Sequence, residues 1–356
     1  MPYQIKIEKT KTPKEKPDQH NLGFGRFFTD HMFVMDYAAG KGWHDPRIIP
    51  YSPLSLDPST MVFHYGQAIF EGLKAYRSKD GRILLFRPTK NIERLNISND
   101  RLCIPQVDPG FALEAIKTLV KLDEDWIPSL EGTSLYIRPF IISTDPYLGV
   151  RPSHTYKFII ILSPVGAYYP EGINPVKIYV EENYVRSVKG GLGYVKAAGN
   201  YAASLKAQEE ANKKNYTQVL WLDGVEKKYI EEVGTMNVFF VINSEVITPS
   251  LEGSILPGVT RDSVIHVLKS WNIKITERRI TIDEVFDAHA KGMLDESFGT
   301  GTAAVISPIG SLNWKGKTIA ISNEKTGELA QKLYDFITGI QYGKVEDTFN
   351  WTVQVL

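Results

Sequence analysis

The sequence predicts two domains of mixed helices and strands, an α+β or α/β protein. At 356 residues the chain is long enough to form two hydrophobic cores of ordinary size. Both halves contain segments with the alternation of strands and segments with the spacing of amphipathic helices. Residues 164–175 carry three prolines, which predicts a linker. We therefore expect a smaller N-terminal α+β domain over residues 1–165, a linker over 166–175 and a larger C-terminal domain over 176–356.

In the N-terminal half, alternation of apolar and polar residues predicts a peripheral strand at 3–9, which a charged stretch with two prolines follows. Runs of β-branched and aromatic residues predict further strands, and apolar residues in helical phase predict two helices. The expected strands are 25–37, 82–86, 134–143 and 156–162, and the expected helices are 91–102 and 111–126. This combination is typical of an α+β domain.

In the C-terminal half, the same criteria predict strands and helices that follow one another closely. The expected strands are 176–180, 217–222, 227–232, 237–242 and 274–279, and the expected helices are 198–213, 257–269 and 282–290. Residues 297–306 read as a turn rich in glycine and threonine that enters another strand.

Composition excludes several classes of function. Lysine plus arginine and aspartate plus glutamate are 41 each, so no net charge favours nucleic acid or a membrane surface. The single cysteine, Cys103, allows no intramolecular disulfide, and the histidines have no partners at metal-ligand spacing, so no metal site is expected. The N-terminus lacks the apolar core of a secretory signal, and the longest strongly apolar run, 158–162, is too short to span a bilayer. We expect a cytoplasmic protein.

The glycine- and alanine-rich segment 190–201 contains one lysine, Lys196. Small neighbours let the backbone approach a flat ligand closely, and a lysine amine in such a confined space is suited to form a Schiff base. The segment has no Gly-Lys-Ser or Gly-Lys-Thr, which excludes a phosphate loop. Taken alone, a lysine is more often a solvated surface residue, so the interpretation depends on its context.

Three further segments suit the binding of a charged, planar cofactor. In 231–237 an acidic pair ends an apolar strand, where a carboxylate could hold a proton on a ring nitrogen. In 256–261 a helix begins, and the amides of Val259 and Thr260 could bind phosphate. In 298–304 small residues could offer backbone N–H groups to an oxyanion. The alternatives are a solvated strand end, an ordinary helix start and a plain turn.

Arginines and aromatic residues in the first half suit a substrate pocket. Arginine is adapted to bidentate binding of anions, and aromatic rings suit an apolar side chain. Considered singly, each of these aromatic residues is more often part of a core. The candidates are Arg94, Arg138, Phe24, Tyr65, Phe70, Tyr136 and Tyr168.

Five segments, in one order along the chain, resemble those of branched-chain amino acid aminotransferases, which are fold-type IV enzymes that use pyridoxal 5′-phosphate. The segments are FHYGQAIFEGLKAYR, GGLGYVKAAGNYAAS, EEVGTMNVFFV, LPGVTR and FGTGTAAV. The resemblance runs from about Phe24 to about Ile309. It implies a pseudobarrel-like C-terminal domain, with the cofactor at the domain interface.

The resemblance also implies a role for each matching cofactor residue. Lys196 would form the Schiff base with the cofactor and later move the proton at the substrate Cα. Glu232 would contact the pyridine nitrogen, and Tyr201 the phenolic oxygen. The remaining implied contacts are Arg94, Val259, Thr260 and Thr302 around the phosphate, with Thr235 as a further cofactor residue.

For the substrate, the resemblance implies that the backbone of Thr302 and Ala303 receives the α-carboxylate. Arg138 would receive the distal carboxylate when glutamate is the amino donor. The side-chain pocket would be formed by Phe24, Tyr65, Tyr136 and Tyr168, and by Val150 on a loop of the partner subunit. A homodimer is therefore implied.

The resulting hypothesis is reversible transamination of leucine, isoleucine and valine with 2-oxoglutarate by a ping-pong mechanism. A D-amino acid aminotransferase or an aminodeoxychorismate lyase of the same fold is the alternative, which the segment FEGLKAYR with Tyr136 and Arg138 disfavours. A third hypothesis is a binding protein without catalysis. Lys196 argues against that, because binding alone does not require an imine-forming amine.

Overall fold

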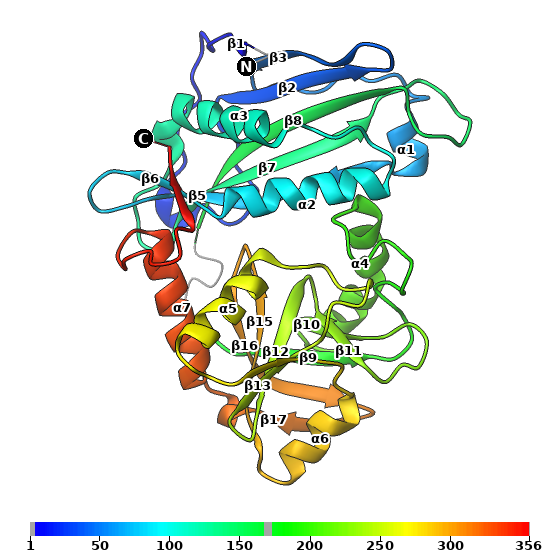
Figure 1. The fold of residues 1–356 in the computed structure, drawn as a ribbon, viewed down its shortest axis with the longest axis vertical. Helices are drawn as coiled ribbons and strands as arrows, with labels where there is room; N and C mark the ends of the chain where they lie inside the picture. The colour runs from blue at the N-terminus through cyan, green and yellow to red at the C-terminus, as the bar shows by residue number, and fades with distance from the viewer. Residues whose placement is uncertain (1–3, 167–172, 356) are drawn as a thin grey trace. The chain divides into compact units, whose positions relative to one another are not determined.

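The computed structural model describes residues 4–166 and 173–355, and the chain divides into two compact units (Figure 1). The first unit comprises Met1–Pro170, Val195–Gly199 and Gly339–Leu356, and the second comprises Glu171–Tyr194 and Asn200–Thr338. The chain first passes from one unit to the other between residues 170 and 171, which lie inside the predicted linker and outside the described ranges. Two segments of the expected C-terminal domain, the one with Lys196 and the end of the chain, thus group with the first unit.

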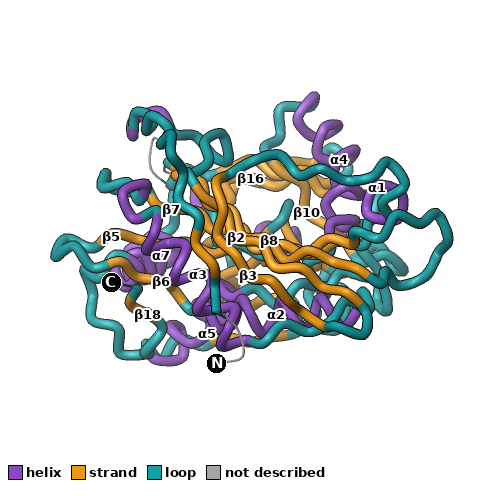
Figure 2. Tube along the Cα trace, turned by 90° about the horizontal axis from the view of Figure 1, so that it is seen from above, coloured by secondary structure: helices purple, strands orange, loops and turns teal. Residues whose placement is uncertain are grey.

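Among the described residues, the strands of the first unit form one sheet. They are β1 (Lys6–Ile7), β2 (His31–Ala38), β3 (Gly42–Pro50), β4 (Ala68–Phe70), β5 (Leu73–Arg77), β6 (Ile83–Phe86), β7 (Ser134–Ser143), β8 (Thr155–Val165) and β18 (Thr352–Gln354). Their order is β1-β3-β2-β8-β7-β5-β6-β18, with β4 beside β7, and Figure 2 shows β2, β3 and β8 side by side. Because β18 pairs with β6, the last strand of the chain completes a sheet built by its first half.

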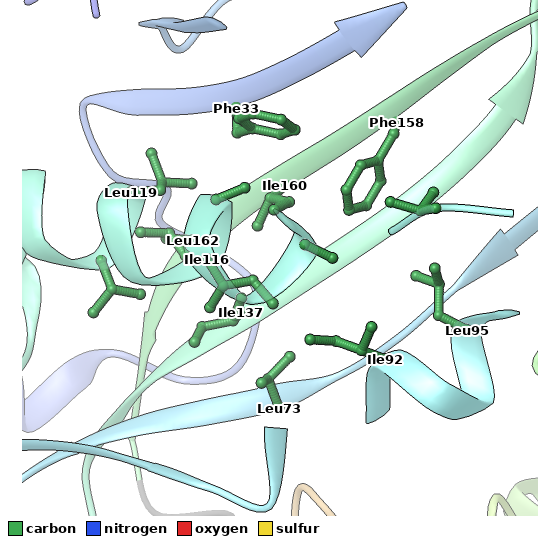
Figure 3. Close-up of a cluster of buried hydrophobic side chains, with 14 of the residues drawn as sticks. Phe33, Leu73, Ile92, Leu95, Ile116, Leu119, Ile137, Phe158, Ile160 and Leu162 are labelled. Carbon is green, nitrogen blue, oxygen red and sulfur yellow. The ribbon is translucent and has the colours of Figure 1, made fainter. Parts of the chain in front are cut away.

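The helices α2 (Pro88–Arg101) and α3 (Pro109–Leu122) pack on one face of this sheet around a buried apolar cluster (Figure 3). The cluster includes Phe33 of β2, Ile92 and Leu95 of α2, Ile116 and Leu119 of α3, Ile137 of β7 and Leu162 of β8. Side chains alternate between the two faces of a strand. Because Ile137 faces this core, its neighbours Tyr136 and Arg138 project from the opposite face, away from the helices.

In the second unit, six strands close into a ring. They are β9 (Val176–Glu181), β10 (Gln218–Leu222), β11 (Ile230–Val233), β12 (Met236–Ile242), β15 (Leu294–Gly301) and β16 (Val305–Trp314). Each pairs with the next, and β16 pairs with β9, which closes the barrel. Trp221, Phe239 and Phe298 are fully buried in this unit. The predicted pseudobarrel-like domain is confirmed, and β13 (Glu245–Thr248), β14 (Ile275–Glu277) and β17 (Lys317–Ala320) extend it.

The remaining helices are α1 (Met61–Tyr65), α4 (Ala198–Lys213), α5 (Val259–Ser270), α6 (Ile282–Ala290) and α7 (Glu328–Gln341), with short 3₁₀ turns at Gln19–Asn21, Glu124–Trp126 and Ser322–Glu324. The bounds predicted for α4 and α6 are confirmed. The helix expected over 111–126 ends at Leu122, and a 3₁₀ turn follows it. The strand expected over 25–37 begins only at His31, because residues 24–26 form a bend. Within the described ranges, no helix is both long and apolar enough to cross a membrane.

Candidate active site

Lys196 lies in the segment of the first unit that leads into α4, and its backbone is held on both sides. Its N–H donates to the Ser98 hydroxyl at 3.0 Å, and its carbonyl accepts from the N–H of Phe70 at 3.1 Å. The next residue, Ala197, forms an antiparallel bridge with Ile69 of β4. These bonds connect the lysine to a strand and to a helix, so it is not part of a free surface loop.

The side chain of Lys196 shares an aromatic surface with Arg138. The Lys196 Nζ lies 4.9 Å from the centre of the Phe70 ring, and the Arg138 Cζ lies 4.7 Å from the same centre. Arg138 also donates to the Tyr136 hydroxyl at 3.1 Å. The structure therefore brings two cationic groups and two aromatic rings together on the face opposite the apolar core, where an anion with an apolar side chain can bind.

Tyr136 contacts two of the other predicted pocket residues. The ring of Phe24 meets the Tyr136 ring edge to face, with 4.9 Å between centroids. A Cβ atom at Gly72 would lie 2.0 Å from the Tyr136 hydroxyl oxygen, so the glycine of the FEGLK segment is required by the position of this tyrosine. Three of the predicted pocket residues, Phe24, Tyr136 and Arg138, thus form one cluster in which Tyr136 contacts the other two.

The other predicted pocket residues have different contacts or lie outside the described ranges. The Tyr65 hydroxyl, at the end of α1, donates to the carbonyl of Leu148. Val150 is 86% exposed in the chain alone. Tyr168 lies outside the described residues.

Arg94 forms a buried ion pair that the sequence did not indicate. Its Nε and Nη2 donate to the two carboxylate oxygens of Glu71 at 2.8 and 2.9 Å, and both side chains are buried. Burial alone would raise the pKa of Glu71. The charge and hydrogen bonds of Arg94, with the charge of Lys196 and the hydrogen bond of Asn91, outweigh it, and the net pKa lies below its ordinary value. The Ser98 hydroxyl donates to the Arg94 carbonyl at 3.0 Å and accepts from the Lys196 N–H, so α2 connects the two predicted cofactor residues.

In the second unit, three predicted cofactor residues line one pocket. Tyr201 comes from the first turn of α4, Glu232 from β11 and Thr235 from the two-residue turn between β11 and β12. The pocket is completed by Arg186, Asn200, Ser204, Gly234 and Leu256. Residues from three separate elements thus converge, as a binding site requires.

Glu232 is almost fully buried and has two hydrogen-bonding or charged partners on one oxygen. The N–H of Leu256 donates to its Oε1 at 2.7 Å, and the Nη2 of Arg186 lies 3.2 Å from the same atom. An adjacent guanidinium stabilises the ionised form of a carboxylate. Arg186 was not predicted, because its contact joins distant segments of the chain and follows no local pattern.

Strand register places further polar groups beside Glu232. Glu232 of β11 is opposite Asn237 of β12, which is opposite Thr300 of β15, so the three lie in one row on one face. The Asn237 amide donates to the Leu256 carbonyl at 2.9 Å, just before α5. The Oγ1 of Thr300 is buried with no hydrogen-bond partner among the described residues, which is typical of a group that meets a ligand.

The two predicted anion-binding segments lie in the same unit. The helix α5 begins at Val259 with Thr260 buried in its first turn, and it packs against β15. Thr302 and Ala303 occupy the turn between β15 and β16. The turn ends at Val305, a β-branched residue with φ of 63°, a conformation that such residues rarely adopt. Strained backbone of this kind is concentrated at functional sites.

Glu231, the other member of the acidic pair, belongs to a different environment, since neighbouring strand residues face opposite ways. The Ser254 hydroxyl donates to its Oε1, and its Oε2 is buried without a partner among the described residues. Burial raises the pKa of Glu231 above its ordinary value, although the Ser254 bond and the charge of Arg186 oppose the shift. This carboxyl therefore stabilises the fold when protonated.

The pH dependence of that contribution gives a prediction. A carboxyl with a raised pKa in the folded state contributes stability that is complete below its ordinary pKa and is lost as pH rises through the folded value. The Glu231→Gln variant stays neutral, so its melting temperature is expected to exceed that of the wild type by a few degrees at pH 8 and to equal it near pH 4. Calorimetry across this range measures the difference. A difference independent of pH would contradict the prediction.

Comparisons of sequence and of structure relate this chain to known proteins. The family model described as amino-transferase class IV matches residues 68–312. The chain is 66% identical over 351 residues to branched-chain-amino-acid aminotransferase 2 of Bacillus subtilis (strain 168), and the match covers 99% of this chain and 97% of that protein. It superposes on the branched-chain amino acid aminotransferase of Escherichia coli with a TM-score of 0.77, at 26% identity, over 91% of this chain and 99% of that one. The structure of the T.th. branched-chain amino acid aminotransferase with pyridoxamine 5′-phosphate gives a TM-score of 0.75, at 26% identity, over 90% of this chain and 98% of that one.

Proposed function

Because this chain belongs to the branched-chain-amino-acid aminotransferases of the class IV aminotransferase family, we propose that it transfers the amino group of leucine, isoleucine or valine reversibly to 2-oxoglutarate. The products are the branched 2-oxo acids and glutamate, formed in two half-reactions of a ping-pong mechanism. The observation that carries the proposal is the cluster of Lys196, Phe70, Tyr136 and Arg138 on one face of the first sheet.

The cofactor of this reaction is pyridoxal 5′-phosphate, which supplies an aldehyde and an electron-withdrawing ring when it is bound. The residues present fit it. A ring N–H requires a carboxylate, and Glu232 is a buried carboxylate that lines a pocket with Tyr201 and Thr235. A phosphate is bound well by a guanidinium and by the backbone N–H groups of a first helical turn, and the chain has Arg94 on α2 and the first turn of α5. We assign Glu232 to the ring nitrogen, Tyr201 to the phenolic oxygen, Thr235 to a further cofactor contact, and Arg94, Val259, Thr260 and Thr302 to the phosphate.

Lys196 supplies the primary amine that attaches to the cofactor aldehyde. When that amine is released, it would act as the base that takes the proton from the substrate Cα. The Phe70 ring beside the Lys196 Nζ limits the positions that this flexible side chain can take. We assign the amides of Thr302 and Ala303 to the α-carboxylate, which would orient the substrate.

The pocket must accept both an apolar side chain and the distal carboxylate of glutamate. Arg138 lies over the Phe70 and Tyr136 rings, so the rings offer apolar surface to leucine while the guanidinium is available to a carboxylate. We assign Phe24 and Tyr65 to the remaining surface, together with Tyr168, which lies outside the described residues. We assign Val150 to the pocket of the partner subunit in a homodimer. Assembly as a homodimer and a cytoplasmic location remain predictions.

The visible absorbance spectrum of the purified protein tests the proposal. With cofactor bound, L-leucine is expected to convert the aldehyde form to pyridoxamine 5′-phosphate, and 2-oxoglutarate to convert it back. D-Alanine is the control and should leave the band unchanged. A band that responds to D-alanine but not to leucine would favour a D-amino acid aminotransferase. If added cofactor gives no band, the role of Lys196 is wrong.

A further inference from the structure

We infer that Arg186 is a positioning residue that keeps the proton shared by Glu232 and the cofactor on the ring nitrogen. The inference rests on the proposed function, because it requires Glu232 to face that nitrogen. Arg186 itself acts through Glu232. The inference goes beyond the assignment of Glu232, since it concerns whether the proton is carried by the ring nitrogen or by the Glu232 carboxylate.

The contact between the two side chains is close and shielded from water. The Arg186 Nη2 lies 3.2 Å from the Glu232 Oε1, and the two side chains are 8% and 3% exposed. Charges buried to this degree interact far more strongly than charges on the surface. The N–H of Leu256 adds a second positive pole to the same oxygen.

Arg186 is held in this position by neutral groups. Its Nη2 also donates to the carbonyl of Gly193 at 3.0 Å and to that of Ser254. Backbone carbonyls orient a guanidinium without cancelling its charge, which acts on Glu232 at 3.2 Å and also on Glu231. A Cβ atom at Gly193 would lie 2.0 Å from the Ser254 carbonyl oxygen, and this close approach explains the last glycine of the GGLG segment.

The consequence follows from the competition between two bases for one proton. A carboxylate buried without a cation becomes more basic, because burial disfavours its charged form. Such a Glu232 would take the proton from the ring nitrogen, leaving a neutral ring that withdraws electrons poorly. A guanidinium fixed beside Glu232 stabilises the negative charge of the carboxylate, so the proton stays on the ring and the two partners remain an ion pair.

A purely structural role for Arg186 makes a different prediction. In that case its removal would lower stability and cofactor affinity, while any enzyme that still bound the cofactor would keep a protonated ring. Only the positioning role couples the arginine to the protonation of the ring nitrogen. That protonation can be observed without measuring activity.

The test is nitrogen NMR of the holoenzyme loaded with pyridoxal 5′-phosphate labelled with ¹⁵N in its ring, with the free cofactor titrated as reference. At pH 7 the wild type is expected to show a protonated ring nitrogen. In Arg186→Met the signal should move to the unprotonated value and kcat should fall about 100-fold with little change in KM, while Arg186→Lys should restore most of both. Arg279→Met, which removes a guanidinium that stacks on Tyr229, is the matched control and should change neither.

Two outcomes would overturn the inference. One is a protonated ring nitrogen in loaded Arg186→Met. The other is an unprotonated ring nitrogen in the wild-type holoenzyme. This second measurement tests the inference even if the Arg186→Met variant does not fold. Glu232→Gln separates this failure from that of the proposed function. If removing the carboxylate leaves the nitrogen signal unchanged, Glu232 does not face the ring, and the cofactor assignment is wrong instead.

Discussion

Replacing Lys196 with alanine is expected to lower kcat for transamination of leucine by at least about 10⁴-fold. The variant loses both the amine that attaches the cofactor and the base that moves the proton at the substrate Cα. The surrounding fold should persist, because the backbone N–H and carbonyl of residue 196 keep their hydrogen bonds in the variant. Large loss of rate with an unchanged melting temperature is therefore the expected result.

Steady-state rates with leucine and 2-oxoglutarate measure the effect, and Lys206→Ala is the matched control. Lys206 is an exposed lysine on α4 that pairs with Glu210 one turn away, so its loss should leave kcat unchanged. Methylamine added to Lys196→Ala should restore part of the rate, because a free amine can replace the missing base. A rate near that of the wild type would overturn the assignment of Lys196.

Local sequence was sufficient to predict elements whose signals are periodic or compositional. The bounds of α6 follow from helical spacing and those of α4 from a run of good helix formers, and Lys196 stands out because its neighbours are small. The predicted anion sites at the start of α5 and at the turn after β15 are likewise features of short segments. The structure places Tyr201, Glu232 and Thr235 in one pocket, as a shared ligand would require.

Contacts between distant segments could not be predicted in this way. The row of Glu232, Asn237 and Thr300 exists only because of the register of three strands. The pairing of β18 with β6 returns the end of the chain to the first sheet, and no pattern in residues 352–354 specifies a partner. Glu71 and Arg186 were missed for the same reason, since a buried charge is recognised by its partner and the partner is remote in sequence.

Replacing Glu71 with glutamine is expected to lower the free energy of unfolding by about 3–5 kcal/mol at pH 7. The change leaves the buried guanidinium of Arg94 without its carboxylate. The new amide N–H groups would also oppose the donors of Asn91 and Gly72, which point at the Glu71 Oε2. Urea denaturation measures the loss, and Glu93→Gln is the control, because Glu93 lies on the same helix as Arg94 in an exposed pair with Lys90.

The effect of Glu71→Gln should diminish in acid. Because the pKa of Glu71 is lowered in the folded state, its contribution is complete above the ordinary value of 4.5 and is lost as pH falls through the folded value. The double variant Glu71→Gln with Arg94→Met tests whether the pair itself is responsible. Since removing both charges leaves no buried charge of this pair unpaired, its loss should be smaller than the sum of the single losses. Strict additivity would mean that the two side chains stabilise the fold independently and that Glu71 does not hold Arg94 in place for the phosphate.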